Sequence, residues 1–433
     1  MELFVTVDPA QLPRLRAQSI IKSCRLGRSK SWSEQGEIAA SPDSPAFAYD
    51  AAMTSTPLGG SKWQAEMISE KLDIKSYDKE GRFCRVGFRL IEGGAAPLAS
   101  LLQALADRVP LRLAPQQRWA GAFALLRDAP PAPSKGKTPV MTAETGNAAA
   151  LRAIARASLA HLLANLHCLE ATGAPEAIHQ MRVALRRLRS AMSLFRALLH
   201  DPQSQSLRTE LRWMQQVLGA ARDKDVLMAE ILEPVDQLFH SAPGYRALCA
   251  QIEATRQADR AAMLTEIKGK RFAKSLLRLA CWLEQVGAGD PVGEEPVRRL
   301  ALATLNRRHR RVRKHMAQFH TLDETGRHEC RIEIKKLRYA IDFFGGVISD
   351  RRSSKMLTQL ASLQDVLGLL NDIASAGRTL QHIAKESADR DVAWAAGMVA
   401  GWHKNRTDDL LDQAWNLWRE VEKIPPFWKG DDA

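Results

Sequence analysis

The chain contains the same basic segment twice, at positions 149 residues apart. The first copy reads His179-Gln-Met-Arg182-Val-Ala-Leu-Arg186-Arg187-Leu-Arg189, and the second reads His328-Glu-Cys-Arg331-Ile-Glu-Ile-Lys335-Lys336-Leu-Arg338. A second motif follows at the same offset, because Val217-Leu218-Gly219 and Asp223 are matched by Val366-Leu367-Gly368 and Asp372. Two separate motifs that share one offset indicate a duplicated structural unit. We therefore predict two similar halves, each with its own row of cations.

Helical spacing separates a basic face from an apolar face in each copy. At about 100° per residue, one arc of about 80° holds the basic row of each helix: His179, Arg182, Arg186 and Arg189 in the first copy, and His328, Arg331, Lys335 and Arg338 in the second. A second arc holds an apolar stripe suited to a core: Met181, Leu185, Leu188, Met192 and Phe195, then Cys330, Ile334, Leu337, Ile341 and Phe344. Arg187 lies apart from the basic arc of its helix, and each row spans about 15 Å.

A row of cations on a helix is often only a solvated surface. Two features favour a binding role here. The basic arc holds no balancing Glu or Asp at i+4, whereas ordinary surface helices mix the two signs. Clustered cations also repel one another, and the chain contains such a cluster twice. Clusters of this kind usually have a polyanionic partner. A lone His is more often a structural residue than a ligand-binding one, but His179 and His328 each lie in line with the basic row.

These residues resemble the CHAD domain, the conserved histidine α-helical domain. Its pattern is a duplicated H-x-x-R-[VI]-x-x-[KR]-[KR]-L-R helix followed by an L-G-x-x-x-D segment, and both copies are present here. The resemblance implies two antiparallel helical bundles related by a pseudo-twofold axis, whose basic helices face a shared channel. It also implies that the ligand is inorganic polyphosphate and that the domain has no catalytic centre. By position, the implied binding residues are His179, Arg182, Arg186, Arg187, Arg189, His328, Arg331, Lys335, Lys336 and Arg338.

Polyphosphate also suits such rows on physical grounds, since it carries charge along its length and has no bases to read. The planar guanidinium of Arg can make two parallel bonds to phosphate oxygens, whereas Lys acts as a point charge. Nucleic acid is the competing polyanion. The sequence has no helix-turn-helix signature, no zinc-finger spacing and no aromatic-rich β platform, and the basic rows contain no Phe, Tyr or Trp. We expect no specific nucleic-acid partner, but nonspecific binding stays open.

Composition agrees with an anionic partner without identifying it. The chain has 433 residues, 62 Lys plus Arg against 49 Asp plus Glu, and a formal net charge of +13. Its six cysteines are scattered without a C-x-x-C pair, so we expect neither zinc nor a disulfide framework. No apolar run approaches the length of a membrane span, and the N-terminus lacks a signal-peptide pattern. These features predict a cytoplasmic protein without cofactor, metal or membrane partner. The resemblance implies association with polyphosphate granules and with granule-associated proteins.

The second half of the chain reads as helical throughout. A Pro-rich linker at 128–144 contains Pro130-Pro131-Ala-Pro133 and is expected to be extended and semi-rigid. The helical domain follows at 145–428, with repeat one at about 145–287 and repeat two at about 297–428. The clearest predicted helices are Asn147–Thr172, Ser206–Leu218, Lys270–Val286 and Val297–Phe319. We expect the basic cluster of the last one to lie mostly on the surface, with one or two members in the channel: Arg307, Arg308, Arg310, Arg311, Arg313 and Lys314.

Residues 1–127 are predicted to form a small α+β domain. Leu3–Val7 and Phe83–Ile91 alternate as strands do, and Pro97–Val109 reads as a helix. From Glu92 to Leu126, a strand, a Leu-rich helix and a closing strand resemble the end of a CYTH domain, the triphosphate-tunnel fold. Residues 30–60 are polar and rich in Ser and Ala, which predicts a disordered insert.

The CYTH resemblance implies an E-x-E-x-K strand and further carboxylates that hold a metal ion against a triphosphate. This chain keeps Glu2 but departs from the pattern at Phe4, and it has Arg85, Gly87 and Arg89 where acidic residues should alternate. We therefore expect a degenerate, catalytically silent domain. The favoured hypothesis is a polyphosphate-binding module that is not an enzyme, and the rival is a metal-dependent triphosphatase that acts through the N-terminal region.

Overall fold

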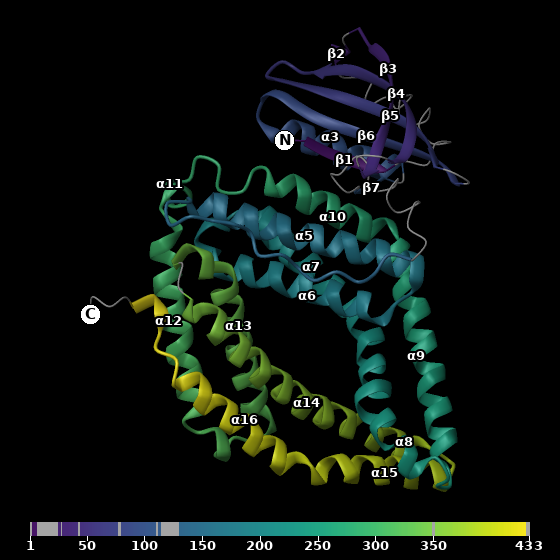
Figure 1. Cartoon of the computed structure of the whole chain (residues 1–433), viewed down its shortest axis with the longest axis vertical. Helices are drawn as coiled ribbons and strands as arrows, with labels where there is room; N and C mark the ends of the chain where they lie inside the picture. Colours follow the sequence, from purple (N-terminus) through teal and green to yellow (C-terminus); the bar gives the residue numbers. More distant parts are fainter. Residues whose placement is uncertain are drawn as a thin grey trace.

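The structure, a computed structural model, describes residues 2–6, 25–26, 28–41, 44–76, 79–109, 111–113, 130–348 and 351–429. An antiparallel sheet with one helix forms the N-terminal part, and helices form the rest (Figure 1). The prediction of a mainly helical protein with a small α+β region ahead of it is confirmed. The predicted closing strand near Leu126 and the first two residues of the predicted linker lie outside the described residues.

Seven strands form the N-terminal sheet in the order β2-β4-β5-β6-β1-β7, and β3 also pairs with β4. All the pairings are antiparallel. The predicted strands and helix of this region are confirmed within a few residues. The elements are β1 (Glu2–Thr6), β2 (Arg25–Leu26), β3 (Lys30–Ser41), β4 (Ser44–Gly59), β5 (Trp63–Ser76), β6 (Lys79–Gly93), α3 (Ala95–Arg108) and β7 (Arg112–Leu113).

The prediction of a disordered insert at residues 30–60 is wrong, because β3 and β4 pair along this segment and β4 pairs onward with β5. The segment contains few large apolar residues, so its alternation is hard to recognise. Polar side chains bond across the hairpin instead, with Ser31 Oγ 3.1 Å from Thr54 Oγ1 and Gln35 Nε2 donating to Asp50 Oδ2 at 3.0 Å. A pair of strands with small and polar residues can thus form when a neighbouring strand, here β5, pairs with it to extend the sheet.

The two faces of the sheet differ in character. One face contributes Met67, Val86 and Phe88 to a core shared with α3 and the helical part. The other face carries carboxylates of β5 directly opposite arginines of β6, because the register pairs Glu66 with Arg89 and Glu70 with Arg85. Both pairs form ion pairs, at 2.5 Å for the first. The arginines noted in the sequence therefore face acidic partners on the neighbouring strand.

The N-terminal part rests on the helical part through α3. This helix packs against α10, and Lys274 of α10 forms an ion pair with Asp107 near the end of α3. Strand β7 contacts the same helix. Figure 1 shows this arrangement, with the sheet above α10 and the chain running down through the first repeat (teal) to the second (green to yellow).

Twelve helices of the described residues build the helical part. The four clearest sequence predictions are confirmed, although α10 and α12 each end three residues before the predicted end. The helices are α5 (Asn147–Thr172), α6 (Pro175–Leu194), α7 (Pro202–Val226), α8 (Asp236–Phe239), α9 (Tyr245–Lys268), α10 (Lys270–Leu283), α11 (Pro291–Glu294), α12 (Val297–Met316), α13 (Glu324–Ile348), α14 (Arg352–Glu386), α15 (Arg390–Asn405) and α16 (Thr407–Glu422).

Local sequence signals set the ends of the helices near the site. Helix α5 ends at Gly173, whose φ of 65° lies in the left-handed region that glycine adopts without strain. The chain turns there and Pro175 begins α6, since proline suits the first turn of a helix. Helix α7 begins after Asp201, whose carboxylate accepts the backbone N–H of Ser204 at 2.8 Å. These signals place α5, α6 and α7 as consecutive packed neighbours.

Equivalent residues of the two repeats meet at the centre of the helical part. Phe195 and Phe344 hold the same position in the two copies, and their rings contact edge to face with centroids 6.1 Å apart. An antiparallel bridge between Gly146 and Pro296 also joins the starts of α5 and α12, the first helices of the repeats. The two repeats are thus in direct contact through equivalent residues.

The Pro-rich segment that enters the helical part is held against its surface. Residues 130–145 have no regular helix or strand. The backbone N–H of Ser134 donates to Asn165 Oδ1 at 3.0 Å, and Asn165 Nδ2 donates back to the Ser134 carbonyl at 2.9 Å. Further along, the Thr138 hydroxyl donates to Asp342 Oδ1 at 2.8 Å. Because Asn165 belongs to repeat one and Asp342 to repeat two, the segment contacts both repeats.

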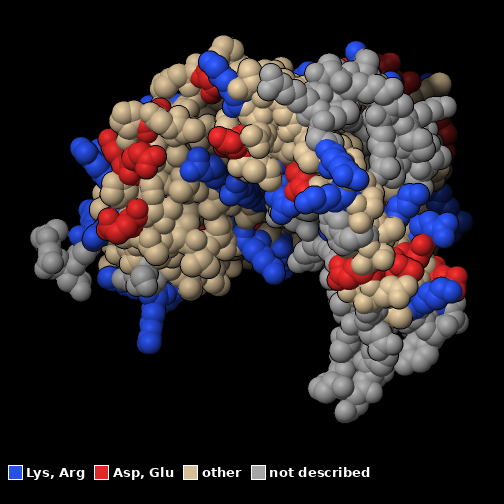
Figure 2. Space-filling model, turned by 90° about the horizontal axis from the view of Figure 1, so that it is seen from above, with Lys and Arg blue, Asp and Glu red and all other residues tan. Residues whose placement is uncertain are grey.

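Basic side chains are spread over much of the surface. Figure 2 shows Lys and Arg on the face seen from above, with several gathered near its middle. Among the residues that the structure describes, no helix is both long enough and apolar enough to cross a membrane.

Candidate functional site

The apolar stripes predicted on the two signature segments are buried. The segments form α6 and α13, and every stripe residue is at most 1 % exposed: Met181, Leu185, Leu188, Met192, Phe195, Cys330, Ile334, Leu337, Ile341 and Phe344. The prediction of a core face on each helix is confirmed. Because the basic arc lies beside this stripe, burial of the stripe places the basic rows at the edge of the core, where their side chains are partly shielded from water.

The first arginine of copy one lies on a glycine of the next helix. A Cβ on Gly219 of α7 would stand 2.8 Å from Arg182 Nη1, so any larger residue there would displace this guanidinium. Arg182 Nη1 donates to the Gln215 carbonyl at 3.3 Å, and its Nη2 lies 4.0 Å from Asp223 Oδ1. Burial lowers the pKa of Arg182, although Asp223 opposes that shift. The L-G-x-x-x-D motif therefore seats and orients this arginine.

Copy two repeats the arrangement with more space. A Cβ on Gly368 of α14 would lie 3.8 Å from Arg331 Nη2, which is an ordinary van der Waals distance. Burial lowers the pKa of Arg331, and the nearby Asp372 opposes the shift. Burial also raises the pKa of the Asp372 carboxyl, which accepts a hydrogen bond from Asn371 Nδ2 at 3.2 Å. Each first arginine is thus matched with the aspartate of its own repeat.

The two rows meet at Arg186 and Lys335. Arg186 Nε lies 3.4 Å from the hydroxyl of Tyr339, a residue of the other repeat. Lys335 has its pKa lowered from 10.5 to about 7, first by burial and then by Arg331, Arg186, Arg338 and Arg182. The lowered pKa of Lys335 therefore reflects its burial together with the nearby cations of both repeats.

The two histidines occupy different environments. His179 is half-buried, and burial together with Arg222 lowers its pKa to about 4, so the ring is neutral at pH 7. His328 is exposed, and its Nδ1 lies 2.8 Å from the amide oxygen of Asn371. Arg222 and Asn371 hold equivalent positions in α7 and α14. Each histidine therefore lies beside the same position of the following helix, at the outer end of its row.

Two of the predicted binding residues point away from the rows. Arg187 is buried and forms an ion pair with Asp342, and its guanidinium lies 5.1 Å from the centre of the Phe343 ring. Lys336, its equivalent, donates to Glu333 at 2.6 Å, and Glu333 also accepts from the buried Arg308 at 3.2 Å. Each of these cations is paired with a carboxylate of the protein, so the pair has little net charge with which to attract a ligand. The structure therefore brings Arg187 and Lys336 into contacts within the protein.

The remaining predicted residues lie at the ends of the rows. Arg189 is exposed, and Arg212 of α7 lies close enough to lower its pKa further than burial alone does. Arg338 is half-buried, with its guanidinium 5.9 Å from the centre of the Tyr339 ring. Arg189 and Arg338 are equivalent residues, and Arg189 has Arg212 beside it.

The structure adds residues that helical spacing alone does not identify. Arg222 and Asn371 lie beside the histidines, and Tyr339 reaches across to the other row. The motif glycines and aspartates orient the first arginines. The sequence does indicate the glycines and aspartates, because they recur at the same 149-residue offset as the basic segment. No pattern within one helix reveals a neighbour on the next.

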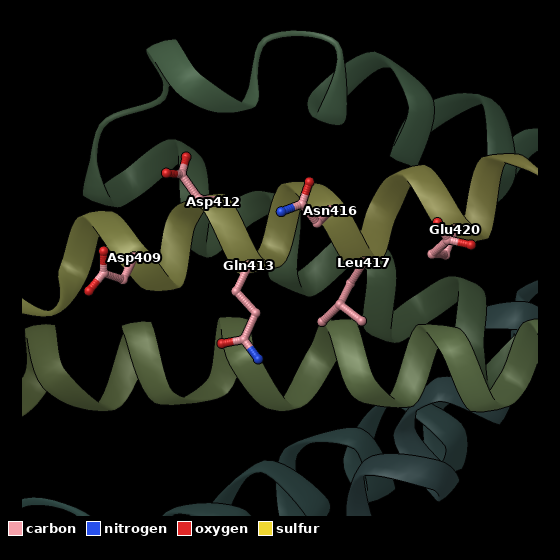
Figure 3. Close-up of a pocket in the computed structure, with 6 residues that line it drawn as sticks. All are labelled: Asp409, Asp412, Gln413, Asn416, Leu417 and Glu420. Atoms are coloured by element: carbon pink, nitrogen blue, oxygen red, sulfur yellow. The ribbon is translucent and has the colours of Figure 1, made fainter.

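Two surface hollows lie away from the basic rows. One, of about 470 Å³, is lined by α16 and is acidic, with Asp409, Asp412 and Glu420 on its walls. Figure 3 shows Gln413 and Leu417 of this helix pointing toward the neighbouring helix, whereas Asp412 points away from it. Carboxylates repel a polyanion, so this hollow has the wrong charge for such a ligand.

A second hollow, of about 420 Å³, lies between α12 and α16 and is basic. Arg310, Arg313 and Lys314 of the cluster noted in the sequence line it, and Arg313 lies 3.9 Å from Glu422. Arg308 of the same cluster is buried. Arg307 lies near Arg196 of repeat one, which lowers its pKa together with burial. Five of the six members are exposed, namely Arg307, Arg310, Arg311, Arg313 and Lys314, so the cluster lies mostly on the surface as predicted.

No group of three or more His, Cys, Asp or Glu side chains suited to a metal ion occurs in the part of the chain that the structure describes.

Comparison with known proteins identifies the helical part. The family model described as "CHAD domain" matches residues 153–381. The crystal structure of the CHAD domain from the plant Ricinus communis is similar, with 28% sequence identity and a TM-score of 0.60, over 67% of this chain and 96% of that chain. PptA from Streptomyces chartreusis shares the fold at 19% identity and a TM-score of 0.51, over 64% of this chain and 100% of that one. A search of curated protein sequences gives no match. Since the family model covers more than half of its residues, the chain belongs to the CHAD domain family.

Proposed function

We propose that the chain binds inorganic polyphosphate along the basic rows of α6 and α13. The observation that carries this proposal is the convergence of four cations from two repeats, in which Arg182, Arg186 and Arg331 lie close enough to act on Lys335. Asp223 and Asp372 are the aspartates that act on Arg182 and Arg331, and two carboxylates against four cations leave the group with a positive excess. A linear polyanion that lies along both rows would remove their mutual repulsion.

The state of individual atoms supports an anionic ligand. Arg331 Nε is buried, and among the described residues it has no hydrogen-bond partner. A buried N–H without an acceptor is unusual in folded proteins, and an incoming phosphate oxygen would satisfy it. Negative charge brought near Lys335 would also favour its charged form at neutral pH. Both features describe a site that is completed by an anion.

The surroundings favour a polymer without bases over nucleic acid. Tyr339 is the aromatic residue of the site, and it is 4 % exposed with its ring stacked against Phe343 at 6.1 Å. A buried ring cannot receive a nucleobase, and base stacking on exposed rings supplies much of the affinity for single-stranded nucleic acid. We expect nucleic acid to bind weakly and without specificity.

The direct test replaces the four converging cations with uncharged residues. The variant Arg182→Gln, Arg186→Gln, Arg331→Gln, Lys335→Gln should bind long-chain polyphosphate about two to three orders of magnitude more weakly at 0.1 M salt, at about 0.7 log units per lost contact. The matched control removes four cations of α12 that lie outside the site: Arg298, Arg299, Arg310 and Lys314. Equal losses in both variants would mean that binding depends on net charge alone, and retained affinity in the first would refute the site.

A competition experiment separates polyphosphate from nucleic acid. Binding to long-chain polyphosphate is measured in a salt titration with single-stranded DNA as competitor. Poor displacement by DNA supports the proposal, whereas equal affinity for both polymers would identify the rows as an unselective electrostatic surface.

For the N-terminal part we propose a reduced CYTH-like domain without catalytic activity. The antiparallel sheet with a single helix is compatible with such a remnant. Its charged face supports the absence of catalysis, because Glu66 and Glu70 are paired with Arg89 and Arg85 and are not free to hold a metal ion. Release of phosphate from triphosphate in the presence of Mg²⁺ or Mn²⁺ would instead support the rival triphosphatase.

We also propose that the protein is cytoplasmic and associates with polyphosphate granules through the helical part. A fluorescent fusion should collect at granules in cells that contain polyphosphate and spread evenly in cells without it. The four-site Gln variant should spread evenly in both.

A further inference from the structure

The two repeats differ in the helix that follows each signature helix. Helix α7 of repeat one carries Arg208, Arg212 and Arg222. At the equivalent positions, 149 residues later, α14 of repeat two carries Leu357, Ala361 and Asn371. Three cations of one half are thus replaced by neutral side chains in the other, although the rows on α6 and α13 match closely.

These arginines form a stripe on one side of α7. At about 100° per residue they share an arc of about 80° with Gly219, the residue on which Arg182 rests, and the stripe extends for about 21 Å. Glu210 lies on the opposite side of the helix and is engaged by Arg271 at 3.0 Å. The acidic residue of this stretch therefore does not neutralise the stripe.

Contacts along the helix pair place the stripe beside the basic row of α6. At one end Arg182 Nη1 donates to the Gln215 carbonyl at 3.3 Å, and at the other Arg208 Nη2 donates to the Met192 carbonyl at 3.2 Å. Since α6 positions rise as α7 positions fall, the two helices run antiparallel. Arg189 and Arg212 lie between these contacts, and each is close enough to repel the other.

The outer arginines are available to a ligand. Arg189 and Arg212 are both exposed. Within the described ranges, no carboxylate oxygen lies within 4.0 Å of either guanidinium. An exposed pair of like charges without a carboxylate partner is unfavourable by itself and becomes favourable when an anion bridges it.

We propose that the polyanion is bound asymmetrically, continuing from the central rows onto the surface formed by Arg189, Arg208 and Arg212 in repeat one. At the equivalent positions the other half has Arg338, Leu357 and Ala361. This inference rests on the proposed function and adds which half of the duplicated domain holds the polymer beyond the central rows. It predicts that long chains bind more tightly than chains only long enough to cover the central rows.

The test uses substitutions that change the charge equally at the two equivalent positions. Arg212→Gln and Ala361→Glu each lower the net charge by one. Arg212→Gln should weaken binding of long-chain polyphosphate about fivefold at 0.1 M salt and reduce the salt slope by about 0.7, while Ala361→Glu should change the affinity less than twofold. The control is Arg390→Gln, at an exposed residue of α15, which changes the charge far from the surface formed by Arg189, Arg208 and Arg212.

Chain length separates this inference from the proposed function. A short polyphosphate that covers only the central rows should bind wild type and Arg212→Gln alike. Equal losses for Arg212→Gln and Ala361→Glu, or no loss for Arg212→Gln beyond that of Arg390→Gln, would overturn the asymmetry and leave the proposed function intact. Wild-type protein that binds neither short nor long polyphosphate would refute the proposed function itself. Circular dichroism of each variant checks that the helices are retained.

Discussion

Lys335 should couple ligand binding to proton uptake. In the free protein its pKa is about 7, because burial and four arginines disfavour the ammonium form. A polyanion beside the same group would reverse that electrostatic effect and raise the pKa toward the ordinary 10.5. Below pH 7 the lysine is already charged and binding takes up little proton. Above pH 7 the free lysine is neutral, so binding must first recharge it.

The size of the effect follows from this shift. At pH 8 about nine-tenths of the free protein has Lys335 deprotonated, so binding should take up about 0.9 proton, compared with about 0.5 at pH 7. Affinity should fall by nearly tenfold per pH unit well above pH 7, or about 50-fold between pH 7 and pH 9. The favourable contribution of this lysine is thus fully present below its free pKa and is lost as the pH rises.

Isothermal titration calorimetry in buffers of different ionisation enthalpy measures the proton uptake directly. Asp372 and His179 also have shifted pKa values in this site, so a variant must isolate the lysine. Lys335→Arg keeps the charge at every pH of the experiment, and it should bind at pH 7 while losing most of the pH dependence between 7 and 9. Wild-type affinity that is constant from pH 7 to pH 9, with heats independent of buffer, would refute the coupling.

Four further substitutions test the framework of the site. Gly219→Ala should lower polyphosphate affinity about fivefold at 0.1 M salt, since the new methyl displaces a guanidinium. Gly368→Ala should bind normally and gain up to about 1 kcal/mol in free energy of unfolding. A binding assay with urea titration distinguishes the two variants, and equal losses of affinity would contradict the role of Gly219. Arg187→Met should lower the free energy of unfolding by about 3 kcal/mol by leaving Asp342 unpaired, with little change in polyphosphate affinity. A large loss of affinity with unchanged stability would show that Arg187 binds the ligand. Asn165→Leu should cost about 1–3 kcal/mol and release the Pro-rich segment, so limited proteolysis should cleave near residue 134 faster than in wild type, and unchanged cleavage would show that other contacts hold the segment.

The helical part could be predicted from its sequence because its signals are local and periodic. The stripes on α6 and α13 follow the helical repeat, and the start of α5 matches the prediction to the residue. The hairpin of β3 and β4 could not be predicted in this way. Its residues become a sheet only through pairing with β5, which is a nonlocal interaction that polar alternation does not reveal.

The site was predictable in part. Helical angles group His179, Arg182, Arg186 and Arg189, and the structure keeps this group on one side of α6 and brings its centre close to α13. The same angles set Arg187 apart, and the structure shows it bound to Asp342. The seat of Arg182 on Gly219 depends on how two helices pack, so spacing along one helix could not indicate it.

The contact of Phe195 with its own equivalent has a consequence for the direction of the bound polymer. We propose that the two repeats are related by an approximate twofold axis at this contact. Such an axis reverses the sense of one repeat relative to the other, so a strand that runs forward along α6 would run backward along α13. A nucleic-acid strand has unlike ends and would present its sugars in opposite senses to the two repeats. A polyphosphate chain is the same read from either end. The symmetry of the central rows therefore matches a ligand without polarity, and only the extra arginines of α7 distinguish one end of the path from the other.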